Sequence, residues 1–90
     1  MLTVEYTTQF KRDLKQAKKR NKNLDLLQEI MTLIEHEKPL PHKYKNHSLS
    51  GNWRHHKELH VEPDWLLIYK YVSARNAVTF VRTGTHSDLF

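Results

Sequence analysis

The spacing of apolar residues in the first third of the chain predicts a strand followed by two helices. Residues 2–6 alternate apolar and polar side chains, as in a short strand. A threonine at position 7 or 8 can cap a helix whose buried face repeats every three or four residues: Phe10, Leu14 and Ala17. Asn23 can cap a second helix with one apolar stripe: Leu24, Leu27, Ile30, Met31 and Ile34. The short connection predicts an antiparallel helical hairpin.

The pattern changes to strands in the second half of the chain. Pro39 ends the second helix, because the residue before a proline is pushed out of the α region. Residues 39–52 are polar and read as a loop, and three strand-like runs with short turns between them follow at 53–61, 65–72 and 77–83. The three runs predict an antiparallel meander. The expected fold is α+β, in the order β-α-α-β-β-β, with the helical hairpin packed on a small antiparallel sheet.

Composition narrows the class of protein. Ninety residues make a single domain, 1–90, and the absence of cysteine suits a reducing compartment. No apolar run is long enough to cross a bilayer, and the start of the chain lacks the features of a signal peptide, so we expect a cytoplasmic protein without a membrane partner.

The charge balance favours polyanionic partners. The chain has 15 Lys and Arg against 10 Asp and Glu, a net charge of +5, which favours nucleic acid or an acidic protein. Six of the basic residues fall on the outer face of the first helix: Lys11, Arg12, Lys15, Lys18, Lys19 and Arg20. A solvated face whose charge offsets the helix dipole is the simpler interpretation, and a phosphate-binding surface is the alternative.

A meander also collects ionisable side chains at one edge of the sheet. The end of its first strand, the start of its second and the end of its third lie together. Five side chains therefore meet there: His60, Asp64, Trp65, Arg82 and His86. The tail up to Phe90 lies at the same edge, and the loop containing His47 can fold back over it.

Two uses of this set are not catalytic. His60, His86 and Asp64 are acceptable zinc or iron ligands, but no spacing in the sequence places two ligands on one element at this edge, so we expect no metal and no other cofactor. In a purely structural role, His60 and Asp64 would stabilise the turn. Arg82 would then pair with Asp64 or Asp88, and the aromatic residues would join the core.

The third use is cleavage of an RNA phosphodiester. That reaction needs a group to remove the 2′-hydroxyl proton, a group to protonate the leaving oxygen and a fixed positive charge at the phosphorus. Histidine, with an ordinary pKa of about 6.5, can perform either proton transfer near neutral pH. Arg82 can supply the positive charge, and Trp65 and Phe90 offer faces on which a base can stack.

Three segments of the sequence resemble the YafQ branch of the RelE/ParE toxin superfamily. They are HSLSGNW at 47–53, HVEPDWLLIY at 60–69 and RTGTH at 82–86, the last followed closely by a terminal Asp-Leu-Phe. The resemblance runs nearly end to end and implies a RelE-like microbial RNase fold. It also implies a bacterial type II toxin, a ribosome-dependent endoribonuclease (mRNA interferase) that cuts messenger RNA, inhibits translation and is neutralised by a cognate antitoxin.

The resemblance assigns roles to residues. Four positions match the family's acid, base and positioning groups: His47, His60, Asp64 and His86. Three match its phosphate-stabilising arginine, its site tryptophan and its C-terminal aromatic residue: Arg82, Trp65 and Phe90. His86 is the first choice for the general acid, and the base is left open among His60, Asp64 and His47, because it depends on distances and coupled pKa values.

A few features depart from the family's pattern or extend it. Lys57, a candidate substrate-binding residue, stands where the family has arginine, so it offers a point charge in place of a two-pronged contact. His55 and His56 point to opposite faces of the expected strand and are left outside the site. The resemblance gives the basic helix face a second use, contact with ribosomal RNA, and implies an antitoxin segment that folds on binding. Two alternatives are a gyrase-binding toxin of the ParE branch, which needs no acid and base, and a nucleic-acid-binding module without toxicity.

Overall fold

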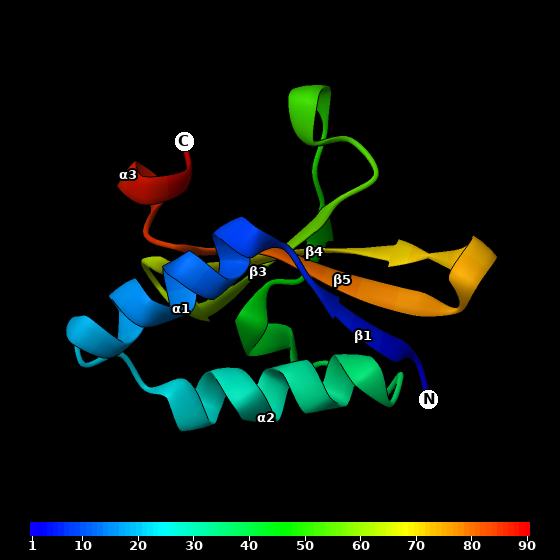
Figure 1. Cartoon of the computed structure of the whole chain (residues 1–90), viewed down its shortest axis with the longest axis horizontal. Helices are drawn as coiled ribbons and strands as arrows, with labels where there is room; N and C mark the ends of the chain where they lie inside the picture. Colours follow the sequence, from blue (N-terminus) through cyan, green and yellow to red (C-terminus); the bar gives the residue numbers. More distant parts are fainter.

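The computed structural model describes all 90 residues, which form one five-stranded mixed sheet covered by helices (Figure 1). The strands are β1 (Thr3–Tyr6), β2 (His47–Ser48), β3 (Lys57–Glu62), β4 (Trp65–Val72) and β5 (Ala77–Gly84). The helices are α1 (Thr8–Lys19), α2 (Leu24–Glu35) and α3 (His86–Leu89). The expected α+β class and the expected element order of residues 1–38 are confirmed. None of the helices has the length and apolar character needed to cross a membrane.

The strands lie in the order β1-β5-β4-β3-β2. Strands β3, β4 and β5 form the expected antiparallel meander, with partners such as Leu59 opposite Leu67. The sheet is not wholly antiparallel, because β1 pairs in parallel with β5, with Thr3 opposite Ala77. A parallel pair needs a long connection between its strands, and here the helices and the meander supply it. The apolar pattern of β1 identifies a strand without identifying its partner.

The segment before the meander differs from the expected loop and strand. His47–Ser48 forms a fifth, very short strand on the outer edge of β3. The run expected as strand from residue 53 begins only at Lys57, because Gly51–Trp53 forms a 3₁₀ turn and His55 adopts a left-handed backbone with φ 70°. A two-residue strand is too short to show alternation in sequence, and a turn of 3₁₀ helix can imitate it.

The main core lies between the sheet and the two long helices. Phe10 of α1 and Ile30 of α2 pack with Tyr69 and Phe80 of the sheet, and all four are fully buried. Burial of a large apolar side chain contributes about 1.5–3 kcal/mol, so this layer supplies most of the driving force for folding. The other face of the sheet buries a smaller cluster: Leu66, Ile68 and Leu89.

Helix α1 also covers the edge of β5 beyond the end of β1. The Thr7 backbone N–H donates to the Phe80 carbonyl at 3.2 Å, and the Thr7 hydroxyl donates to the Val81 carbonyl at 2.7 Å. The same hydroxyl caps α1 by accepting the Phe10 N–H at 2.9 Å, as expected of a threonine at position 7 or 8. One side chain therefore starts the helix and ties it to the last strand.

We expect Thr7→Ala to lower the free energy of unfolding by about 1–2 kcal/mol, because it removes both the cap and the tertiary hydrogen bond. Thr7→Ser should keep most of the stability. Thr8→Ala is the matched control, since Thr8 is exposed and its hydroxyl makes no hydrogen bond to the protein. Urea denaturation of the purified chains measures all three, and equal stability of Thr7→Ala and the parent would contradict the dual role.

Candidate active site

Three histidines from three different elements gather on the face of the sheet opposite the long helices. His47 lies in β2, His60 in β3 and His86 at the first position of α3. The ring centroids of His47 and His60 are 6.4 Å apart, and those of His60 and His86 are 5.8 Å apart. The structure therefore brings together the histidines that the meander argument expected, including the one from the preceding loop.

Asp64 holds His86 by two hydrogen bonds. Its Oδ1 accepts the His86 backbone N–H at 2.9 Å and contacts the ring Nδ1 at 2.5 Å. The backbone bond first, and then the ring bond, lowers the pKa of Asp64, so the carboxylate stays ionised. A carboxylate only accepts, which puts a proton on Nδ1 and leaves Nε2 free to face a substrate.

The ring of His60 is oriented by the turn that follows it. Its Nδ1 lies 3.3 Å from the carbonyl oxygen of Pro63. A carbonyl oxygen also only accepts, so Nδ1 carries the proton and Nε2 of the neutral ring keeps its lone pair. The turn at residues 62–64 thus sets the tautomer of His60 and, through Asp64, the orientation of His86.

Glu58 is a site residue that sequence reasoning missed. It is 6% exposed, and its Oε1 lies 3.3 Å from Nε2 of His47, a contact that becomes an ion pair when the ring is protonated. The other ring nitrogen, Nδ1, donates to the Lys45 carbonyl at 2.7 Å. The available signal was period-two spacing, since Glu58 stands two residues before His60 and shares its face of β3.

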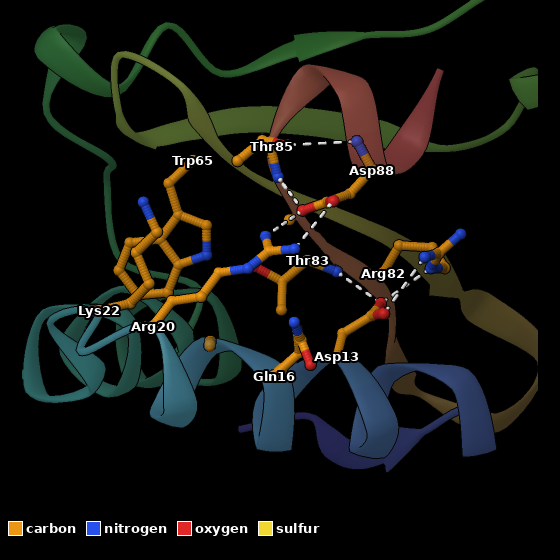
Figure 2. Close-up of a pocket in the computed structure, with 11 residues that line it drawn as sticks. Asp13, Gln16, Arg20, Lys22, Trp65, Arg82, Thr83, Thr85 and Asp88 are labelled. Carbon is orange, nitrogen blue, oxygen red and sulfur yellow. Dashed lines mark hydrogen bonds and ion pairs between the residues drawn. The ribbon is translucent and has the colours of Figure 1, made fainter.

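Arg82 is held at the edge of the same sheet by Asp13 of α1. The guanidinium donates from Nε at 2.8 Å and from Nη2 at 3.2 Å to the two carboxylate oxygens, and Asp13 also accepts the Thr83 backbone N–H at 3.1 Å (Figure 2). Its hydrogen bond with Asp13 raises the pKa of Arg82. Arg82 is the register partner of Ile68, on the histidine face, but no hydrogen bond or ion pair joins it to a histidine. The acid that forms an ion pair with Arg82 is thus Asp13, and neither Asp64 nor Asp88.

The two aromatic residues expected at the site differ in exposure. Trp65 is 1% exposed and belongs to the main core, which corrects the expectation that its ring offers a stacking face. Its Nε1 has no protein partner, and the side chain lines a cavity of about 160 Å³ between α1 and the end of β5 (Figure 2). Phe90 is 61% exposed and lies edge-on to Trp53, with ring centroids 6.1 Å apart. Phe90 therefore keeps a face available, as expected.

Lys57 is not brought to the histidines. It is the register partner of Tyr69, whose side chain lies in the main core, so alternation sends Lys57 to the face opposite Glu58 and His60. This corrects its expected place at the site. His55 is exposed, and His56 packs edge-on against Trp53, so neither joins the three histidines.

No group of three histidine or carboxylate side chains has the geometry to hold a metal ion. Four oxygen atoms already lie against ring nitrogens of the site histidines: Lys45 O, Pro63 O, Glu58 Oε1 and Asp64 Oδ1. What the arrangement offers is two imidazole nitrogens, His60 Nε2 and His86 Nε2, that make no bond to the protein. Such a pair suits proton transfer on either side of one reacting group.

Solved structures similar to this chain include proteins described as toxins. A chain described as a metal-bound toxin from Helicobacter pylori superposes with a TM-score of 0.94 at 40% identity, covering 100% of both chains. The toxin chain of the E. coli DinJ-YafQ toxin-antitoxin complex superposes with a TM-score of 0.90 at 44% identity, covering 99% of this chain and 97% of that one. The class of protein is thus a small α+β toxin.

Sequence comparison identifies the family. A family model described as the bacterial toxin of type II toxin-antitoxin system, YafQ, matches residues 2–90. The mRNA interferase toxin YafQ of Escherichia coli strain K12 is 47% identical over 88 residues, which make up 97% of this chain and 94% of that protein. The chain belongs to the YafQ family of toxins of type II toxin–antitoxin systems, which confirms the resemblance seen in its motifs.

The Asp64 carboxyl should titrate below its usual pKa of 3.8, because both bonds to His86 favour the ionised form. A lowered pKa means that these bonds persist above pH 3.8 and are lost only as the pH falls through the lower folded-state value. His86→Ala should raise the pKa only part of the way, since the backbone N–H remains. Carboxyl ¹³C NMR measures the midpoint, with Ser87→Ala as control, and a midpoint at or above 3.8 in the parent would refute the assignment.

Proposed function

We propose that this toxin is a ribosome-dependent endoribonuclease that cleaves messenger RNA by histidine acid–base catalysis and so inhibits translation. The observation that carries the proposal is the pair of unengaged nitrogens, His60 Nε2 and His86 Nε2, on rings 5.8 Å apart. Two rings at this separation can both reach one phosphodiester. The curated E. coli relative, named as an mRNA interferase, supports the choice of substrate.

His60 acts as the general base and His86 as the general acid. His60 Nε2 takes the proton of the ribose 2′-hydroxyl, and the 2′-oxygen attacks the phosphorus. The bond from phosphorus to the 5′-oxygen breaks as protonated His86 donates from Nε2 to that oxygen, which gives a 2′,3′-cyclic phosphate and a 5′-hydroxyl. Asp64 is not the base in this scheme, because its Oδ1 already accepts both bonds from His86.

Two cationic groups stabilise the charge that develops on the phosphate. Arg82 has its Nη1 uncommitted while Asp13 binds Nε and Nη2, so the guanidinium is oriented and still has donors to offer. His47 becomes a second cation when protonated against Glu58, on the other side of His60. Preorganised charges of this kind need no rearrangement as the reaction proceeds. Phe90 provides the exposed ring on which a nucleotide base stacks.

The partners are a cognate antitoxin and the translating ribosome of the cytoplasm. The E. coli relative solved as the DinJ-YafQ complex supports an antitoxin partner for this chain. Five basic residues on the outer face of α1 are exposed: Lys11, Arg12, Lys15, Lys18 and Lys19. A positive surface of this kind contacts ribosomal RNA through its phosphates. The sixth, Arg20, follows the helix and is bonded to Asp88. The same charge attracts an acidic antitoxin segment.

Induced expression of the parent chain should arrest growth and produce codon-phased cuts in cellular messages, mapped by primer extension. His86→Ala and His60→Ala should each lower cleavage by about a hundred- to ten-thousand-fold, the usual contribution of one proton transfer. His55→Ala is the matched control, because this histidine is exposed and lies apart from the site.

Both variants should keep the fold, measured by circular dichroism, and should still bind the antitoxin. Growth arrest without cuts, unchanged by either substitution, would overturn the nuclease assignment and favour a binding inhibitor such as a gyrase-directed toxin.

Deletion of Phe90 should weaken cleavage mainly by raising the substrate concentration needed for half-maximal rate, because the ring contacts a base and takes no part in proton transfer. Base–aromatic stacking contributes about 1–3 kcal/mol, which corresponds to roughly five- to a hundredfold in affinity. Phe90→Trp should preserve activity and Phe90→Ala should match the deletion. Cleavage of programmed ribosomes in vitro measures both parameters, and an unaltered half-maximal concentration in the deletion would contradict the stacking role.

A further inference from the structure

The one-turn helix α3 positions two residues of the proposed site. His86 is its first residue, and Phe90 follows its last. A single turn of helix cannot hold its own conformation, because forming the first turn orders several residues for few hydrogen bonds. The position of His86 therefore depends on what fastens α3 to the rest of the molecule.

Asp88 joins α3 to the end of α1. Its Oδ2 accepts the Thr85 backbone N–H at 2.9 Å, and its own N–H donates to the Thr85 hydroxyl at 3.2 Å, a reciprocal cap at the start of the helix. Arg20, immediately after α1, donates to Oδ2 from Nη1 at 2.6 Å and to Oδ1 from Nη2 at 3.3 Å. Figure 2 shows this guanidinium reaching across from α1 to the carboxylate.

The surroundings of Asp88 are shaped for this contact. A Cβ at position 84 would lie 2.9 Å from the Asp88 Cβ, so Gly84 lets α3 fold back closely over the end of β5. On its other sides α3 is held by Leu89, which is buried against the sheet, and by Asp64, which binds His86. The bond with Arg20 lowers the pKa of Asp88, so the pair remains charged throughout the physiological range.

We propose that Arg20 is a positioning residue for RNA cleavage, which through Asp88 fixes α3 and so sets the orientation of His86 toward the phosphodiester. The inference rests on the proposed nuclease function. Arg20 touches neither His86 nor Asp64, and its effect passes through the backbone from Asp88 to Thr85 and His86. Arg20, which immediately follows α1, thereby sets the position of α3 at the opposite end of the sequence.

If Arg20 contacted RNA directly, cleavage would also depend on Arg20, but the variants would have different effects. An arginine that binds phosphate through its charge tolerates Arg20→Lys, and Asp88→Asn would release it for stronger binding. A positioning arginine does not tolerate lysine, which cannot bond both carboxylate oxygens. Asp88→Asn would then harm catalysis as Arg20→Ala does, although the amide oxygen can still accept the Thr85 N–H.

The test measures single-turnover cleavage of messenger RNA on programmed ribosomes, at saturating ribosome and as a function of ribosome concentration. Arg20→Ala, Arg20→Lys and Asp88→Asn should each lower the maximal rate by about tenfold. This loss is smaller than the roughly hundredfold loss that a misplacement of about an ångström can cause. The half-saturating concentration should stay unchanged. Arg20→Ala/Asp88→Asn should be no slower than either single variant, because both remove one interaction.

Arg75→Ala is the matched control, since Arg75 is another exposed arginine that bonds both oxygens of one carboxylate, that of Glu5, and it lies outside α1 and α3. It should leave the maximal rate unchanged. A second readout does not require activity: ¹⁵N NMR of the His86 ring should show a weakened Nδ1 hydrogen bond to Asp64 in Arg20→Ala and an unaltered one in Arg75→Ala.

The outcomes separate the inference from the function on which it rests. If the parent chain and Arg75→Ala cleave equally well while Arg20→Ala and Asp88→Asn keep the full maximal rate, the positioning role is wrong and the nuclease stands. If Asp88→Asn lowers the half-saturating concentration and Arg20→Lys is fully active, Arg20 binds RNA directly and the inference is overturned. If the parent chain does not cleave at all, the proposed function fails, and the ¹⁵N readout alone decides whether Arg20 positions His86.

Discussion

The complete burial of the first part of β4 is the constraint on which the rest of this molecule depends. Five consecutive residues of that strand, Trp65 to Tyr69, are at most 1% exposed, so the strand must be covered on both faces. Trp65, Leu67 and Tyr69 face the two long helices, and Leu66 and Ile68 face the side that α3 covers. Because the strand is fixed on both faces, the turn immediately before it is fixed too. That turn contains the carbonyl and the carboxylate that orient two histidines.

The chemistry of the site follows from which atoms around the histidines are acceptors. The carbonyl oxygens of Pro63 and Lys45 and the carboxylate of Asp64 accept hydrogen bonds and have no proton to donate. Each therefore fixes a proton on the Nδ1 that faces it. The remaining nitrogens, Nε2 of His60 and of His86, bond to no protein atom, whereas Nε2 of His47 faces Glu58. In the proposed mechanism, the roles of acid, base and charge stabiliser thus come from hydrogen bonds to the backbone and from two carboxylates.

Ion pairs between the start and the end of the chain hold the margins of the sheet. Asp13 pairs with Arg82, Arg20 with Asp88 and Glu5 with Arg75, and each pair joins residues roughly seventy positions apart. The pairs of Arg20 with Asp88 and of Glu5 with Arg75 are exposed and add little stability individually, whereas the pair of Asp13 with Arg82 is partly buried. Their consequence is geometric, because they orient two arginines and a one-turn helix next to the histidines. The first helix, which carries the basic surface, is therefore joined to the proposed site by these ion pairs.

Much of this protein was readable from the sequence, because the features concerned are local. Periodicity identified both long helices and the three strands of the meander, since burial of one face imposes a period of 3.6 or 2. Residue type identified Asn23 as one cap and left the other between Thr7 and Thr8. The topology of a meander alone placed His60, Asp64 and His86 at one edge. Motif resemblance identified the family.

The rest was decided by contacts between residues far apart in the chain. The parallel pairing of β1, the two-residue strand at His47 and the burial of Trp65 depend on which surfaces meet, and no local pattern records that. The contact of Glu58 with His47 depends on the pairing of β2 with β3, and the observed register places Lys57 on the face opposite the histidines. The sequence by itself thus determined the elements, the family and the set of available catalytic side chains. Only the tertiary structure decided which nitrogen of each histidine is free and which acid holds each arginine, because hydrogen-bond partners are fixed by three-dimensional proximity.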